Sequence, residues 1–130
     1  MIVVDASAIL EVLLHTPAAG AIIQRIFQEG ETWHTPHLLD LEVAQVLRRY
    51  VTAGEIEAER GSTALEELQG MPFTRYPHVP FLSRIWELRA NVTAYDAAYL
   101  ALAEALAAPL VTRDARLASA PGLEAVVEVL

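Results

Sequence analysis

Short apolar runs alternate with longer segments of helical periodicity along this chain, and that alternation most restricts how it can fold. The first run, Ile2-Val3-Val4, is typical of a strand that is buried on both faces. Segments with apolar residues at helical spacing separate it from the later runs. Strands that alternate with helices in this way predict a three-layer α/β/α sandwich with a mostly parallel central sheet.

Glycine and proline set most of the expected boundaries. We expect strands at residues 2–4, 31–34, 73–76, 110–112 and 126–130. We expect helices at residues 8–14, 18–29, 38–50, 55–69, 82–88 and 94–107, and a short helical turn at 113–118. A chain of 130 residues has the usual length of one domain, so the prediction is a single domain over residues 1–130.

The composition excludes several classes of chemistry. The chain has no cysteine, which excludes disulfide scaffolds, zinc ribbons and thiol catalysis. It also has no lysine, which excludes Schiff-base chemistry and the lysine of a P-loop. The longest run without a charged residue, 12–24, is too short for a membrane span, and the N-terminus lacks the pattern of a signal peptide. The expectation is a soluble cytoplasmic protein without a membrane segment.

Acidic side chains stand where two of the predicted strands end. Asp5 directly follows the first strand, and Asp114 follows the strand at 110–112 by one residue. Ligands of open α/β sheets bind at the carboxyl ends of strands, near the point where the strand order reverses. If the two strands are central neighbours, their carboxylates should lie close together.

Two interpretations of these aspartates remain open. Asp96 and Asp114 could cap helices, and Thr93 to Asp96 fits a capping box, whereas capping is less expected for Asp5. The alternative is a site for a hard divalent ion such as Mg²⁺, which prefers oxygen ligands. Two carboxylates 4 Å apart repel by about 4 kcal/mol at an effective dielectric constant of 20, so a cluster favours a bound cation.

Four stretches of the chain resemble the motifs of the PIN-domain family, and within it the VapC-type toxins of toxin–antitoxin pairs. They cover the opening strand with the first acidic residue, a helix with the second, a helix with the third, and a strand with the fourth. These stretches are 2–8, 41–49, 93–103 and 110–117. A small departure is Gln45, where family members commonly have Asn.

The resemblance implies an endoribonuclease that hydrolyses RNA with a metal-activated water and acts as a toxin. It implies that Asp5, Glu42, Asp96 and Asp114 meet at one end of the sheet as catalytic residues and ligands of Mg²⁺ or Mn²⁺. Ser7 and Thr112 stand where the family often has a hydroxyl beside the ligands, so we assign them a supporting role. The alternative is a catalytically silent binding module that keeps the PIN fold.

Glu42 has a rival, because Asp40 lies only two residues before it. Residues at i and i+2 of a helix point about 200° apart, so the two cannot face the same site. The motif alignment favours Glu42. Asp40 then has the role of an anion near the positive end of the helix dipole.

The net charge of −8 must be reconciled with an RNA substrate. Arginine binds phosphate with a bidentate fork, and the candidates for contact with RNA or a partner are Arg48, Arg49, Arg113 and Arg116. The resemblance also implies a cognate antitoxin, often basic, and a homodimer formed through the helices at 55–69 or 82–88. Trp33, Trp86, Tyr95 and Tyr99 are expected in the core or at an interface.

Overall fold

The computed structural model describes all residues from 1 to 130 and contains one sheet of five parallel strands. The strand order is β3-β2-β1-β4-β5, which places the first strand in the centre. The strands are β1 (Ile2–Val4), β2 (Trp33–Pro36), β3 (Phe73–Tyr76), β4 (Leu110–Thr112) and β5 (Val127–Val129). The predicted α/β sandwich is confirmed, and every strand pair is parallel.

Helices cover both faces of this sheet. They are α1 (Ala6–Leu13), α2 (Ala19–Ile26), α3 (Leu38–Thr52), α4 (Ala58–Gly70), α5 (Leu82–Glu87), α6 (Ala94–Leu106) and α7 (Ala115–Ser119), with a 3₁₀ turn, η1, at Val79–Phe81. The connections from β1 through β2 to β3 move across the sheet in one direction, and those from β3 through β4 to β5 move in the other. Right-handed crossovers therefore place α1 to α4 on one face and α5 to α7 on the other.

The strand order reverses between β1 and β4. Val3 pairs with Leu110 and Val4 with Val111, so the two strands end at the same level. The amide of Asp5 continues the ladder by donating to the carbonyl of Val111 at 3.2 Å. This is the switch point at which open α/β sheets bind ligands, and it brings the residues after β1 beside those after β4.

Helix α6 forms much of the core beneath this point. Every residue from Ala97 to Ala103 is buried, and Leu100 and Leu102 are fully buried. Alternating small residues let the helix approach the sheet, where it packs against β1, β2 and β4. The tight packing fixes the first turn of α6, and with it Asp96, relative to the central strands.

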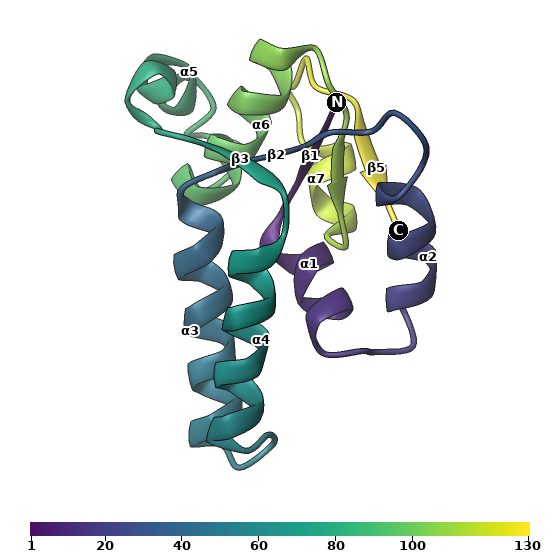
Figure 1. Ribbon diagram of the computed structural model, residues 1–130. Coiled ribbons are helices and arrows are strands. Elements are labelled where there is room, and N and C mark those ends of the chain that lie inside the picture. Colours follow the sequence, from purple (N-terminus) through teal and green to yellow (C-terminus); the bar gives the residue numbers. More distant parts are fainter.

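Helices α3 and α4 lie side by side and extend away from the sheet as a hairpin (Figure 1). Leu39, Val43 and Leu47 bury one stripe of α3 at helical spacing. Glu42 lies next to this stripe and near the start of the helix, where α3 leaves the sheet. The packing of α3 therefore brings Glu42 toward the carboxyl ends of the strands.

Several element boundaries differ from those expected. Helix α1 begins at Ala6 instead of residue 8, because the Asp5 carboxylate accepts from the amide of Ala8 and caps it. Strand β2 lies two residues later than expected, since it pairs from Trp33 to Pro36 with β3. Helix α4 begins only at Ala58, after a turn in which Gly54 has a φ of 75°. None of the helices has the length and apolar character required to span a membrane.

Candidate active site

Asp5 lies at the centre of the site, directly after β1, and is only 6% exposed. Its Oδ1 accepts from the Ser7 hydroxyl at 2.6 Å and from the Ala8 amide at 3.1 Å. Its Oδ2 accepts a short hydrogen bond from the Thr112 hydroxyl. Both oxygens are thus held by donors from α1 and β4, and the carboxylate has one defined orientation.

The hydroxyls of Ser7 and Thr112 connect Asp5 to the loop after β4. Ser7 Oγ accepts from the amide of Arg113 at 2.9 Å, and Thr112 Oγ1 accepts from the amide of Asp114 at 3.0 Å. Each hydroxyl has a single proton, which it donates to Asp5. The supporting role proposed for both residues therefore has a physical basis, since they orient Asp5 and fix the start of the loop that carries Asp114.

Burial raises the pKa of the Asp5 carboxyl above its ordinary value. The hydrogen bonds from Ser7, Thr112 and the Ala8 amide lower the pKa and offset part of this effect, while the charge of Asp96 raises it further. No arginine contributes to the shift. The Asp5 carboxylate is therefore a buried negative charge that no cation of the protein neutralises.

Glu42 approaches the site from α3 and is held by Tyr99 on α6. The Tyr99 hydroxyl donates to Glu42 Oε1 at 2.6 Å. Burial raises the pKa of Glu42, and the charges of Asp96 and Asp5 raise it further, against the lowering effect of the Tyr99 hydrogen bond. Tyr99 is itself 2% exposed, and burial followed by the charge of Glu42 raises the pKa of its phenol.

Tyr99 is the residue of the site that sequence reasoning missed. Its burial agrees with the expectation of a core residue, but its hydroxyl is directed to Glu42. A signal was present in the sequence, because Tyr99 lies three residues after Asp96. Positions i and i+3 share one helix face, so a side chain at 99 points to the same side as the carboxylate at 96.

Asp96 combines the two roles that the sequence left open. Its amide donates to the Thr93 hydroxyl at 3.1 Å, which caps α6 in the way that the Thr93 to Asp96 spacing predicts. Burial raises the pKa of its carboxyl; the Thr93 hydroxyl lowers it, the charge of Asp114 raises it and that of Arg116 lowers it. Capping uses the backbone of Asp96 and leaves its carboxylate with the site.

Asp114 differs from the other three carboxylates because an arginine neutralises it. Arg116 donates through Nε to Oδ1 at 3.0 Å and through Nη2 to Oδ2 at 2.7 Å, and its amide donates to Oδ1 at 3.0 Å. The hydrogen bond with the guanidinium holds the pKa of Asp114 below its ordinary value. Asp114 also caps α7, so capping is seen at Asp5 and Asp114 alike.

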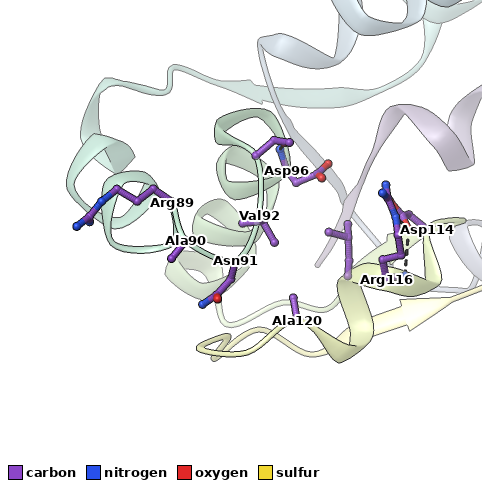
Figure 2. A pocket seen from close by; sticks show the side chains of 10 residues that line it. Arg89, Ala90, Asn91, Val92, Asp96, Asp114, Arg116 and Ala120 are labelled. Atoms are coloured by element: carbon purple, nitrogen blue, oxygen red, sulfur yellow. Dashed lines mark hydrogen bonds and ion pairs between the residues drawn. The ribbon is translucent and has the colours of Figure 1, made fainter.

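Two depressions are lined by Glu42, Asp96 and Asp114, whereas Asp5 lies beneath the surface and lines neither. One, the α6–α7 hollow, has a volume of about 490 Å³ and is lined by Asp96, Asp114 and Arg116 among others. Figure 2 shows the Asp96 carboxylate turned toward the side of the hollow on which Asp114 and Arg116 lie. The other, the α1–α3 groove, has a volume of about 690 Å³ and is lined by residues that include Ser7, Glu42, Gln45, Arg49 and Arg113.

The remaining candidate residues, three arginines and Asp40, differ in whether they lie near the site. Arg48 is exposed on α3 but does not line the groove that its neighbour Arg49 lines. Arg113 donates through Nη1 to the carbonyl of Leu130, and its Nε lies 3.8 Å from Oε1 of Glu11. Asp40 forms a bidentate ion pair with Arg75 of β3, at 2.8 and 2.9 Å. Asp40 is thus engaged at the edge of the sheet, while Glu42 is the acidic residue of α3 that interacts with Asp5 and Asp96.

The donor set fits a hard divalent ion in its chemistry. It consists of carboxylates without histidine or cysteine, which suits Mg²⁺ or Mn²⁺. As the side chains stand, no three of them lie close enough together to hold one ion jointly. Mg²⁺ usually keeps several waters and takes only one or two carboxylates directly, so contacts through water are compatible with this spacing.

An α/β sheet with one buried carboxylate, Asp5, and three partly buried ones at its switch point defines a class of site suited to metal-assisted chemistry. Comparison with known proteins gives the family. The PIN domain profile matches residues 2–123, so the chain belongs to the PIN domain family.

Individual relatives agree with this assignment. The chain is 49% identical over 117 residues to Ribonuclease VapC9 from Mycobacterium tuberculosis, covering 90% of this chain and 88% of the relative. Its fold is similar to that in the crystal structure of VapBC2 from Rickettsia felis bound to a DNA fragment from their promoter, with a TM-score of 0.74 and 14% identity. The match covers 100% of this chain and 99% of that chain. The fold is also similar to that in a toxin–antitoxin complex from Klebsiella pneumoniae, with a TM-score of 0.67 and 20% identity. That match covers 98% of this chain and 97% of the other chain.

Proposed function

We propose that this protein is a metal-dependent endoribonuclease and the toxin of a toxin–antitoxin pair. One observation carries the proposal: Asp5, Glu42 and Asp96 interact at the switch point of the sheet, where the pKa of each is raised and no cation of the protein forms an ion pair with any of the three. Such an arrangement costs stability unless a ligand compensates it. The similarity to Ribonuclease VapC9 supports RNA as the substrate.

The residues that would hold Mg²⁺ or Mn²⁺ are Asp5, Glu42, Asp96 and Asp114. When bound, such an ion supplies hydroxide near neutral pH and offsets the charge of the scissile phosphate. Ser7 and Thr112 keep the oxygens of Asp5 directed by their two hydrogen bonds.

Tyr99 and the arginines complete the proposed machinery. Tyr99 orients Glu42 through its hydrogen bond. Arg49 and Arg113 line the α1–α3 groove next to Glu42, where their guanidinium groups can bind the RNA backbone. Binding by local arginines is needed because the net charge of −8 opposes long-range attraction of RNA.

We propose two protein partners. The first is a cognate antitoxin with basic character, supported by the negative charge of this chain and by the similar fold in the toxin–antitoxin complex from Klebsiella pneumoniae. The second is another copy of this chain, which docks on α5 and η1. Val79, Leu82 and Trp86 are 66%, 51% and 67% exposed there, which is unusual for large apolar side chains in contact with water only. The molar mass of the purified protein, measured by light scattering, tests the dimer.

The decisive experiment is cleavage of cellular RNA by the purified protein, free of antitoxin, in Mg²⁺, in Mn²⁺ and in EDTA. Asp5→Asn and Asp96→Asn are the test variants, because they remove one charge and keep the shape of the side chain. Asp40→Asn is the matched control on the acidic residue that pairs with Arg75. We expect cleavage in either metal, none in EDTA, and loss in both test variants only.

The result that contradicts the proposal is an absence of cleavage by folded protein that binds the metal. The protein would then be a PIN-fold binding module, and the carboxylates would serve as helix caps. Circular dichroism of every variant confirms that a loss of activity is not a loss of fold. Mapping of the cut ends would give the RNA target.

A further inference from the structure

Asp114 is the one carboxylate of the site that already has a cation. The guanidinium of Arg116 contacts both oxygens of Asp114, at 3.0 and 2.7 Å (Figure 2). Asp5 and Glu42 accept only from hydroxyls and an amide. Of the four carboxylates of the site, only Asp114 forms an ion pair with a cation of the protein.

The ion pair between Asp114 and Arg116 is exposed and therefore weak. The Arg116 side chain is 87% exposed, and the Asp114 side chain is 24% exposed. Exposed ion pairs stabilise proteins only weakly, so a competing partner of similar strength can replace either member. Asp114 keeps a second role when the guanidinium leaves, because its Oδ1 also accepts from the amide of Arg116 and caps α7.

Both members of the pair face the α6–α7 hollow together with Asp96. An ion that binds Asp114 needs the same oxygens as the guanidinium and carries the same sign of charge. A phosphate offers Arg116 the same bidentate acceptor geometry as the carboxylate. The hollow therefore brings together a carboxylate that can bind an ion and an arginine that can bind RNA.

We propose that Asp114 and Arg116 form an exchangeable pair: a divalent ion takes the Asp114 oxygens, and the released Arg116 binds an RNA phosphate in the α6–α7 hollow. This inference rests on the proposed nuclease function and assigns Arg116 a direct contact with the RNA substrate. Metal binding to Asp114 releases Arg116 for RNA, and RNA binding to Arg116 releases Asp114 for the metal. Metal and RNA must therefore strengthen each other's binding to the same extent.

The test measures binding alone and uses two variants with opposite expected signs. Mn²⁺ affinity is measured by calorimetry, and affinity for a labelled single-stranded RNA is measured by anisotropy in EDTA, where cleavage does not interfere. In Arg116→Gln we expect Mn²⁺ to bind about two- to fivefold more tightly and RNA to bind more weakly. In Asp114→Asn we expect weaker Mn²⁺ binding and RNA binding about two- to fivefold tighter, since asparagine keeps the cap of α7.

The matched control is Arg89→Gln, which removes an equal charge from the rim of the same hollow. Arg89 lies over the ring of Trp86 at 4.6 Å and donates to the Trp86 carbonyl, so it occupies no carboxylate. We expect its Mn²⁺ affinity to equal that of the wild type. An equal gain in Arg89→Gln and Arg116→Gln would show a general effect of charge and would overturn the inference.

Two further results would also overturn it. If Arg116→Gln leaves Mn²⁺ affinity unchanged while the wild type binds Mn²⁺ and cleaves RNA, the pair is a static cap and the proposed function stands. If the wild type binds no Mn²⁺ at all, the proposed function fails and the exchange fails with it. Circular dichroism of each variant shows whether α7 is retained.

Discussion

The hydroxyl of Tyr99 lies 2.6 Å from Oε1 of Glu42 and joins α6 to α3 across the candidate site. The two residues are 57 positions apart in the chain, so the contact depends on the tertiary fold. Tyr99 is 2% exposed and its phenol has a raised pKa, so it remains a hydrogen-bond donor at neutral pH. Glu42 thus has a fixed direction that its own helix does not provide.

Tyr99→Phe should lower cleavage activity about 10- to 100-fold, because Glu42 loses the partner that orients it. The unfolding free energy should fall by about 1 kcal/mol. Tyr76→Phe is the control, since it removes a 2.7 Å hydrogen bond with His34 at the edge of the sheet. Thermal denaturation should show equal stability losses in the two variants, whereas rate measurements should show a loss of activity in Tyr99→Phe only. Equal losses of activity in both variants would rule out an orienting role for Tyr99.

Glu42→Gln should reduce cleavage more than about 100-fold, because the amide keeps the Tyr99 hydrogen bond but lacks the charge that a metal ligand needs. Asp40→Asn should retain activity within about twofold and lose about 1 kcal/mol or less of stability, since it weakens only the partly exposed pair with Arg75. Initial rates on a defined RNA compare the two variants. A larger loss in Asp40→Asn would assign the ligand role on α3 to Asp40.

Asp5, Glu42 and Asp96 should each make the metal-free protein less stable as the pH rises above the ordinary carboxyl pKa values of 3.8 and 4.5. Because the pKa values of Asp5, Glu42 and Asp96 are raised, the folded state holds protons that the unfolded state has released. The loss is complete above the raised values. Groups with a lowered pKa act in the opposite sense: Asp114, Glu31 and Glu104 below the ordinary carboxyl values, and His34 below its ordinary value of 6.5.

Thermal denaturation in EDTA between pH 4 and pH 8 measures this effect. Glu42→Gln should show a smaller decline than the wild type, because one of the three carboxyls is gone. Mn²⁺ should raise the melting temperature of the wild type most at the alkaline end, where the carboxylates are ionised. The same pH dependence in Glu42→Gln and in the wild type would contradict the raised pKa of Glu42, because the groups outside the site are identical in the two proteins.

Arg49→Gln should weaken RNA binding and reduce its dependence on salt, whereas Arg48→Gln should do neither. The two arginines are adjacent on α3, yet only Arg49 lines the α1–α3 groove. Each lost phosphate contact lowers the slope of log affinity against log salt by about 0.7 for single strands. Anisotropy titrations in EDTA at several salt concentrations give that slope, and equal slopes for both variants would place RNA outside this groove.

The sequence predicted the sandwich well because local signals and tertiary packing agree in this chain. Strand β1 and the strand at 110–112 were located to the residue, since apolar runs between polar boundaries leave little choice. Helix starts were less accurate where tertiary contacts decide them. The beginning of α1 depends on Asp5, whose carboxylate is oriented by Thr112 from the far end of the chain.

Sequence reasoning named the acidic residues of the candidate site but not the contacts among them. Motif spacing points to Asp5 and Asp114, and their position after neighbouring strands agrees with the topology. The hydrogen bond of Tyr99 and the pairing of Arg116 with Asp114 depend on side-chain directions that spacing alone does not give. The difference between Arg48 and Arg49 has the same origin.

The hydrogen bond between Thr112 and Asp5 spans 107 positions of the chain. During synthesis β1 leaves the ribosome first, but its partner β4 follows only when most of the protein has been made. A nascent chain therefore has no assembled site while it is still attached to the ribosome before residue 112. Any cleavage that depends on the hydrogen bond between Thr112 and Asp5 therefore begins only when nearly the whole chain has been synthesised.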